Sequence, residues 1–320
     1  MRIVNRGVDF DDVLLIPGVS DSISSREEVD ISTYLGKIKL KIPIIASPMK
    51  GIVGIGIIRG IFDAGGIGIL HRFHNNDSDR ENIIGNLWDA GGDFGIAVGL
   101  DDDFYHLALA KGASIICIDV ANGYLPSVRR FVDEIATCIT KKNYSCEVMA
   151  GNVATMDGAQ SLYDAGASII RVGIGSGQLC TTRNNTGIGV PQLTAISDCI
   201  GDWYVVADGG IRNSGDAVKA LAVGADAVMI GSLFGHCNES EHDGHISGMA
   251  SEEFQKQFYG EVKKSVEGIT KECEKSVSLE TFLKEFSWNM KSAFTYLNSN
   301  NITALQATAQ FINTGRGSIK

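Results

Sequence analysis

The sequence predicts an α/β protein with a single (β/α)8 barrel of the TIM type, and three observations support this. Eight short runs rich in Val, Ile and Ala recur along the chain, and helical patterns fill the gaps between them. The runs are almost continuously apolar, as in parallel strands that are covered on both faces. A pattern of helix end, Gly-Ala and strand start returns at Gly112, Gly166 and Gly224. Eight βα units account for 320 residues without a second domain.

The order of the elements follows from these patterns. The expected strands are residues 42–46, 67–70, 94–100, 114–121, 146–153, 168–175, 203–210 and 226–233. The expected helices are residues 52–64, 78–90, 102–111, 127–141, 157–165, 191–200, 215–223 and 278–299. The three repeated glycines are expected to end helices in a left-handed conformation. A doubly wound open sheet is the alternative architecture with the same alternation.

Composition and charge narrow the classes of function. Glycine is abundant, at 38 residues against 5 prolines, which indicates tight turns and close backbone approach to a ligand rather than a flexible linker. A net charge of -10 argues against nucleic acid as a partner. The chain has neither a signal-peptide pattern nor an apolar run long enough to span a membrane, so we expect a cytoplasmic protein. Seven cysteines without a C-x-x-C pair are expected to be reduced thiols.

The active site of such a barrel lies at the carboxyl ends of its strands. The loop after the sixth strand, residues 173–189, contains five glycines and Cys180. The seventh strand ends in Asp208-Gly-Gly, and the eighth ends in Ile230-Gly-Ser. Backbone amides exposed by glycine at these two ends are typical of the barrel phosphate site. Asp208 is expected to accept hydrogen bonds from a ribose.

The setting of Cys180 distinguishes it from the other cysteines. Four of them fall within expected strands or helices, where a buried and inert thiol is the simpler interpretation. A cysteine in a glycine loop at the barrel mouth, followed by two threonines, predicts a nucleophile, although a structural role is the alternative. His71, at the end of the second strand, is a general base, a ligand or an orienting residue. The loop carbonyls offer a place for a monovalent cation.

At this point the motifs resemble a known family. The segment GIGSGQLCTTR at 173–183, followed by TGIGVPQ at 186–192, resembles the catalytic cysteine loop of IMP dehydrogenases and GMP reductases. Further matching motifs are DFDDVLL at 9–15, ASPM at 46–49, DVANGY at 119–124, AGNV at 150–153, DGG at 208–210, IGS at 230–232, GMAS at 248–251 and EG at 267–268. The resemblance covers nearly the whole chain, and only the last twenty or so residues match poorly.

Within that family the chain is more similar to GMP reductases. Only 23 residues, 71–93, separate the second and third strands, which leaves no room for the inserted regulatory (CBS) domain of typical dehydrogenases. The stretch 252–266 lacks the Arg-Tyr pair with which dehydrogenases activate water, and DVANGY is the reductase form of its motif. IMP dehydrogenase, converting IMP and NAD to XMP, stays an alternative because Ser47-Pro-Met and Gly231-Ser-Leu resemble that enzyme.

The resemblance implies a reaction and a set of site residues. The reaction is the NADPH-dependent reductive deamination of GMP to IMP and ammonia, in which Cys180 attacks the purine and Thr182 and Glu267 move protons. Substrate contacts are implied at Asp208, Gly209, Gly210, Gly231, Ser232, Gly248 and Met249. NADPH contacts are implied at Arg72, Asp119, Val120 and Ala121. The carbonyl groups of Gly173, Gly175 and Cys180 are implied ligands of potassium.

The resemblance also implies an assembly and shows departures from the family. It implies one catalytic domain over residues 1–320, with an active-site flap at about 235–277 and a C-terminal tail at about 300–320, assembled as a homotetramer. Gln178 stands where the family has a phosphate-binding serine, and Ser247 replaces a tyrosine. A non-catalytic protein that binds purine nucleotides is therefore a further alternative. A flavin-dependent barrel oxidoreductase would share the phosphate site but needs no cysteine loop.

Overall fold

The computed structural model describes residues 7–19, 21–74, 76–89, 91–100 and 102–314, and it contains the expected barrel. Eight parallel strands close on themselves in the order β10-β11-β4-β5-β6-β7-β8-β9. They are β4 (Ile44–Ala46), β5 (Ile67–Leu70), β6 (Gly95–Val98), β7 (Ile115–Asp119), β8 (Glu147–Val153), β9 (Ile169–Val172), β10 (Tyr204–Asp208) and β11 (Ala227–Ile230). The closure confirms the (β/α)8 fold and excludes the open sheet.

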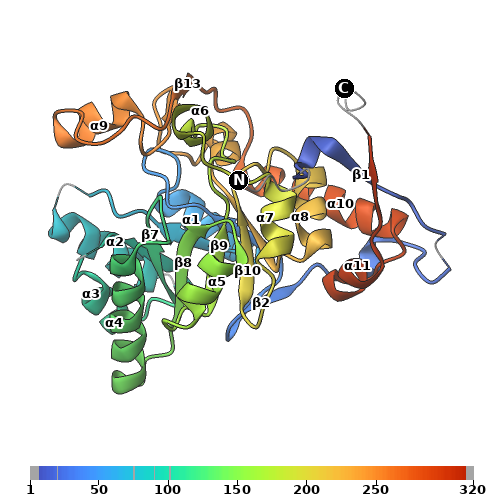
Figure 1. The fold of residues 1–320 in the computed structure, drawn as a ribbon, viewed down its shortest axis with the longest axis horizontal. Helices are drawn as coiled ribbons and strands as arrows, with labels where there is room; N and C mark the ends of the chain where they lie inside the picture. The colour runs from blue at the N-terminus through green and yellow to red at the C-terminus, as the bar shows by residue number, and fades with distance from the viewer. Residues whose placement is uncertain (1–6, 20, 75, 90, 101, 315–320) are drawn as a thin grey trace, which may run out of the picture.

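Helices surround the barrel in the predicted order (Figure 1). They are α1 (Ile55–Asp63), α2 (Asp77–Asp89), α3 (Tyr105–Ala110), α4 (Pro126–Lys142), α5 (Met156–Tyr163), α7 (Gln192–Asp198), α8 (Ser214–Val223) and α10 (Leu279–Tyr296). Gly112, Gly166 and Gly224 have φ values of 76°, 107° and 128°, as expected for glycines that end helices. At Gly224 the backbone conformation favours glycine, and an added Cβ would also displace the end of the exposed Ile200 side chain.

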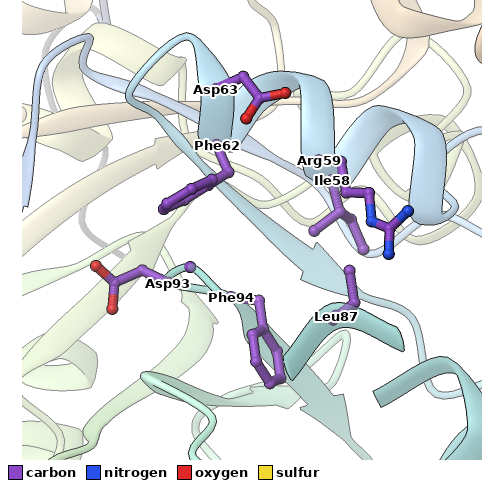
Figure 2. Close-up of a pocket in the computed structure, with 8 residues that line it drawn as sticks. Ile58, Arg59, Phe62, Asp63, Leu87, Asp93 and Phe94 are labelled. Carbon is purple, nitrogen blue, oxygen red and sulfur yellow. The ribbon is translucent and has the colours of Figure 1, made fainter. Parts of the chain in front are cut away.

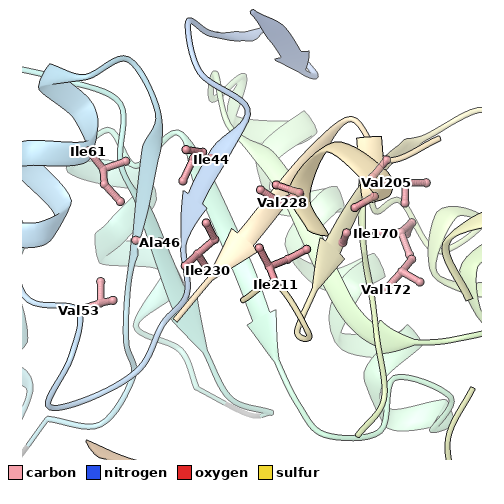
Figure 3. Packing of buried hydrophobic residues seen from close by; sticks show 14 of the residues in the cluster. Ile44, Ala46, Val53, Ile61, Ile170, Val172, Val205, Ile211, Val228 and Ile230 are labelled. Atoms are coloured by element: carbon pink, nitrogen blue, oxygen red, sulfur yellow. The ribbon is translucent and has the colours of Figure 1, made fainter. Parts of the chain in front are cut away.

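Alternation along the strands divides the apolar core into two layers. Side chains of one parity fill the barrel interior, among them Ile45, Ile69, Cys117, Met149, Ile169 and Val206. Side chains of the other parity face the helices, as Figure 3 shows for Ile44, Ile170, Val205 and Val228. Because both faces of each strand are buried, the sequence shows continuous apolar runs instead of alternation.

A hairpin closes the end of the barrel opposite the carboxyl ends of the strands. It consists of β2 (Thr33–Leu35) and β3 (Ile38–Leu40), and its side chains Leu35, Ile38 and Leu40 join the interior layer. At the other end lie α6 (Thr182–Thr186), α9 (Glu252–Tyr259) and the antiparallel pair β12 (His245–Ser247) and β13 (Thr270–Glu272). Figure 1 shows β2 at the bottom of the view and α6, α9 and β13 at the top.

The chain beyond residue 300 packs against the rest of the protein through residue 314. Helix α11 (Ile302–Thr308) is anchored by Gln306, whose side-chain amide donates to the Ala225 carbonyl at 3.2 Å. Strand β14 (Phe311–Asn313) pairs antiparallel with β1 (Val13–Leu15). Short 3-10 helices complete the described elements: η1 (Phe10–Asp12), η2 (Arg26–Glu28) and η3 (Ser232–His236). Among the described residues, no helix combines the length and the apolar character that crossing a membrane requires.

Candidate active site

A cavity of about 400 Å³ opens over the carboxyl ends of the strands, where the sequence analysis expects the site. The predicted residues that line it are Arg72, Asp119, Val120, Ala121, Cys180, Thr182, Ser232, Gly248, Met249 and Glu267. Residues that also line it but that the sequence analysis did not assign to the site include Ser47, Met49, Asn152, Arg171 and Lys264. The predicted residues Asp208, Gly209, Gly210 and Gly231 do not line this cavity, but Asp208, the last residue of β10, contacts the lining residues Asn152 and Arg171.

Three predicted catalytic residues meet in one chain of contacts. The Sγ atom of Cys180 lies 3.2 Å from the Oγ1 atom of Thr182. The Thr182 hydroxyl donates a hydrogen bond of 2.7 Å to Oε2 of Glu267. Glu267 comes from the segment before β13, 85 residues further along the chain. A thiol, a hydroxyl and a carboxylate in sequence form a short path for a proton between a nucleophile and solvent-facing groups.

Backbone hydrogen bonds hold these residues together. The amide of Thr181 donates to the Glu267 carbonyl at 2.9 Å, and the amide of Ile269 donates to the Leu179 carbonyl at 3.0 Å. Residues 179–181 and 267–269 therefore run side by side as a short antiparallel pairing. The expected flap segment is thus attached to the cysteine loop by its backbone, independently of the Thr182 side chain.

Arg183 fixes the shape of the glycine loop from within. Its Nε donates to the Ile174 carbonyl at 3.2 Å, and one Nη donates to the Val190 carbonyl at 2.6 Å. The other Nη forms an ion pair of 3.1 Å with Asp9, in the N-terminal DFDDVLL motif. An added Cβ at Gly175 would lie 2.5 Å from Cγ of Arg183, so the loop can wrap the arginine only with glycine there.

A buried arginine joins two predicted binding residues from different strands. Arg171, on β9, is 4% exposed, and it donates to Asp119 on β7 and to Asp208 on β10, each at 2.8 Å. Asp208 also accepts a hydrogen bond of 2.8 Å from the side-chain amide of Asn152. Burial raises the pKa of the neighbouring Cys117 thiol to about 12, so it stays protonated 3.4 Å from Arg171. The position of Arg171, two residues after the interior residue Ile169, was the available signal for finding it.

The predicted phosphate loops contain two glycines in the left-handed region. Gly209 and Gly210 have φ values of 90° and 82°. An added Cβ at Gly209 would lie 2.5 Å from Oγ of Ser176, so the loop after β10 packs closely on the cysteine loop. The hydroxyl of Ser232 donates to Oε1 of Gln178 at 3.4 Å. Gln178, which replaces a serine of the family, therefore directs its carbonyl oxygen to Ser232 and keeps its NH2 group as a donor.

The predicted cation ligands are backbone carbonyls of the glycine loop. Among the described residues no group of three or more His, Cys, Asp and Glu side chains is placed to hold a metal ion. Gly173 and Gly175 have φ values of 150° and 69°, which turn the chain sharply after β9. The Gly173 carbonyl already accepts a hydrogen bond of 2.9 Å from Asn152. A cation in this loop would therefore depend on carbonyl oxygens and share that of Gly173 with Asn152.

His71 lies in a different cavity from Cys180. It is 5% exposed and lines a neighbouring cavity of about 630 Å³ together with Lys50, Glu241 and Ser247. Its Nδ1 accepts a hydrogen bond of 3.2 Å from the Phe73 amide. Burial lowers the pKa of His71 to about 3, so it is neutral. The geometry agrees with the orienting interpretation of this histidine, whose ring lines a different cavity from the Cys180 thiol.

A third cavity, of about 310 Å³, lies away from the carboxyl ends of the strands (Figure 2). In Figure 2, Arg59 and Phe62 of α1 lie on one side of it and Leu87 of α2 and Phe94, just before β6, on the other, and Asp63 and Asp93 also line it. Arg59 donates to the Asn86 carbonyl at 2.7 Å. The cavity lies between α1 and α2 on the outside of the barrel, and none of the predicted site residues lines it.

Comparison with known proteins places this geometry in a family. The family model described as IMP dehydrogenase / GMP reductase domain matches residues 7–320, including the last twenty residues that were expected to match poorly. A GMP reductase of Bacillus cereus (strain ATCC 14579) is 34% identical over 316 residues, covering 93% of each chain. GMP reductases of Oenococcus oeni and Helicobacter pylori (strain G27) are 32% and 34% identical, covering 93% of this chain and 94% of their own. The chain belongs to the IMP dehydrogenase / GMP reductase family.

Proposed function

We propose that this protein reduces GMP to IMP and ammonia, with NADPH as the reductant and Cys180 as the nucleophile. The observation that carries the proposal is the contact chain from Cys180 through Thr182 to Glu267 in the cavity at the barrel mouth. Similarity to relatives named GMP reductase, over 93% of the chain, supports the choice of reaction within the family.

In the proposed reaction Cys180 forms the covalent bond, and Thr182 and Glu267 transfer the proton. Cys180 forms a bond from Sγ to C2 of the purine, and the amine at that carbon leaves as ammonia after it receives a proton. Glu267 and Thr182 supply that proton through their 2.7 Å hydrogen bond. The hydride that takes the place of the amine at C2 comes from NADPH when it is bound. Breaking the bond from Sγ to C2 then releases IMP and restores the thiolate.

The nucleotide is proposed to lie across the strand ends from β10 to the flap. Asp208 accepts hydrogen bonds from the ribose, while Gly209, Gly210, Gly231 and Ser232 surround the phosphate. Gly248 and Met249, just after β12, contact the base together with Glu267. Gln178 is proposed to donate its amide hydrogens to the phosphate in place of the usual serine, an arrangement that its contact with Ser232 supports.

The residues on the other side of the cavity fit the proposed cofactor. Arg72, Asp119, Val120 and Ala121 line that side. The Nε atom of Arg72 is buried and lies 3.6 Å from Oδ2 of Asp119, so these two predicted cofactor residues form an ion pair on this side of the cavity. The exposed ammonium of Lys264 adds positive charge at the same opening, which favours a cofactor that carries phosphates.

The remaining assignments complete the proposal. Potassium would bind the carbonyls of Gly173, Gly175 and Cys180. The chain would act as one catalytic domain, with a flap at about 235–277 and a tail at about 300–320, in a cytoplasmic homotetramer. The seven free cysteines agree with a reducing compartment. Neither nucleic acid nor a membrane is proposed as a partner.

The decisive experiment is an activity screen of the purified protein. GMP, dGMP and IMP are each offered with NADPH, NADH, NAD and NADP. We expect GMP with NADPH to consume the reduced cofactor and to yield equal amounts of IMP and ammonia. Production of XMP from IMP and NAD at a comparable rate would favour a dehydrogenase. Binding of purine nucleotide without turnover in any combination would favour a non-catalytic family member, and a yellow protein would indicate a flavin enzyme.

A further inference from the structure

Three strands carry a charged side chain inside the barrel at their carboxyl ends. Below these side chains, the interior layer of β7, β8, β9 and β10 is formed by Cys117, Met149, Ile169 and Val206. Two residues further along, the same strands present Asp119, Gly151, Arg171 and Asp208. Because alternate residues of a strand share a face, these four positions form the floor of the mouth. The predicted cofactor residue and the predicted ribose residue thus belong to one layer, with an arginine between them.

Gly151 gives Arg171 the room to cross this floor. It pairs with Asp119 on one side and with Arg171 on the other, so it stands between them in the sheet. An added Cβ at Gly151 would lie 2.6 Å from Cβ of Arg171. With no side chain on β8 at this level, one Nη of Arg171 reaches Asp119 and the other reaches Asp208, each at 2.8 Å.

This bridge is largely desolvated, so the orientations of its two carboxylates depend on the same guanidinium. The side chain of Arg171 is 5% exposed, and those of Asp119 and Asp208 are 19% and 14% exposed. A planar guanidinium with two donors in a fixed arrangement sets the distance and angle between both carboxylates, which a single ammonium does not. Without Arg171, Asp119 would keep only its ion pair of 3.6 Å with Arg72, and Asp208 only the hydrogen bond from Asn152, so nothing would join the two carboxylates.

We propose that Arg171 is a positioning residue that couples binding of the purine nucleotide at Asp208 to binding of the nicotinamide cofactor at Asp119. The inference rests on the proposed function for the identity of these two ligands. When a ligand orders one carboxylate, the shared guanidinium orders the other, so the second ligand meets a group that is already oriented. By linkage, each ligand then increases the affinity of the other by the same factor.

The test measures this factor by calorimetry. The Kd of GMP is determined with and without saturating NADP, the oxidised cofactor, which does not reduce GMP. In the wild-type protein we expect NADP to tighten GMP binding by roughly 5-fold or more, within the usual range of coupling. Arg171→Met should reduce the factor to about 1, and Arg171→Lys, which restores the charge alone, should recover only part of it. A wild-type factor of 1, or an unchanged factor in Arg171→Met, would overturn the proposal.

A matched control separates coupling from folding. Arg80, on α2, is 4% exposed and forms an ion pair of 2.9 Å with Asp102, outside the mouth. Arg80→Met therefore removes an equally buried and paired arginine, and it should lower the unfolding temperature while keeping the wild-type coupling factor. If Arg80→Met also lost the coupling, the loss in Arg171→Met would be a result of general destabilisation, and the proposal would be overturned.

A kinetic measurement covers the case in which Arg171→Met does not fold. In Arg171→Lys the KM values of GMP and NADPH should rise together by several-fold, with a smaller change in kcat. An increase in only one KM would show that Arg171 serves one ligand and would refute the coupling. Failure of the proposed function is recognised separately, because absence of GMP reduction by the wild-type protein leaves the binding measurement intact.

Discussion

The hydroxyl of Thr182 stands between two chemically active groups, 3.2 Å from Sγ of Cys180 and 2.7 Å from Oε2 of Glu267. Thr182 begins α6, in the loop after β9, whereas Glu267 precedes β13. The proposed proton path therefore requires that these two segments be joined, and the hydrogen bond from the Thr181 amide to the Glu267 carbonyl joins them. Substitutions along this path should affect turnover more than nucleotide binding.

Replacing Glu267 with Gln should reduce kcat for GMP by about 100-fold or more, because the amide accepts from Thr182 but cannot supply a proton. The KM of GMP should change much less. Steady-state rates with GMP and NADPH measure both quantities. Glu253→Gln is the matched control, since Glu253 contacts Thr270 on the same flap segment and should retain full activity. Wild-type kcat in Glu267→Gln would contradict the assigned proton transfer.

Replacing Cys180 with Ala should abolish GMP reduction and leave thermal unfolding close to that of the wild type, since the side chain is partly exposed at the mouth. Acid quenching during turnover followed by mass spectrometry should detect a purine adduct on the wild-type peptide that contains Cys180. Cys138→Ala, another partly exposed cysteine, serves as the control and should retain activity. Measurable turnover in Cys180→Ala would rule out covalent catalysis at this position.

Replacing Gly209 with Ala should raise the KM of GMP by about 10-fold or more, because the added Cβ would push Ser176 and the backbone of Gly177 away from the phosphate loop. Gly91→Ala is the matched control. Gly91 has a similar positive φ, of 69°, but an added Cβ there meets no atom within 4 Å. Both variants should lose stability because of the positive φ, Gly209→Ala more so because of its contacts, and only Gly209→Ala should lose affinity. Equal KM values in the two would contradict the close approach at this loop.

Exchange of potassium for a large organic cation should reduce activity several-fold, if carbonyls of the glycine loop hold a monovalent ion as proposed. Ammonium ions are avoided because ammonia is a product. Activity is measured at constant ionic strength in potassium, sodium and tetramethylammonium chloride, since screening alone would affect all three salts alike. Identical rates in the three salts would remove the cation from the proposal.

Asp226 should make the free energy of unfolding decrease as the pH rises from acid toward neutral, whereas most carboxyl groups do the opposite. Burial raises its pKa to about 6, although Oδ2 accepts a hydrogen bond of 2.7 Å from the Val205 amide. The unfolded chain loses this proton near pH 4, so Asp226 costs stability increasingly as the pH rises from about 4 to about 6, by up to about 3 kcal/mol. Above pH 6 the cost is constant.

Denaturant unfolding of Asp226→Asn and wild type at a series of pH values measures this cost. Asparagine keeps an acceptor for the Val205 amide and has no charge, so the stability of the variant relative to wild type should increase between pH 4 and pH 6 and then level off. A difference that is the same at every pH would show that Asp226 ionises alike in the folded and unfolded chains.

Local pattern alone determined the barrel and the position of its proposed nucleophile. Strands buried on both faces must be apolar throughout, and the recurrence of such runs with glycine-capped helices between them indicates eight βα units. A loop that turns at Gly173 and Gly175 and carries Cys180 is likewise encoded in consecutive residues. These features depend on residues that are close together in the sequence, so the sequence alone is enough to recognise them.

The tertiary structure alone decided which distant residues share the site. Arg171 reaches Asp119 and Asp208 because the barrel closes and because Gly151 leaves space between them, and no run of consecutive residues records either condition. In the same way, the pairing of β1 with β14 and the hydrogen bond from Thr182 to Glu267 join segments that lie far apart in sequence. The physical reason is that periodicity reports the surroundings of each residue along its own element, whereas contacts between elements arise only when closure and packing bring them together.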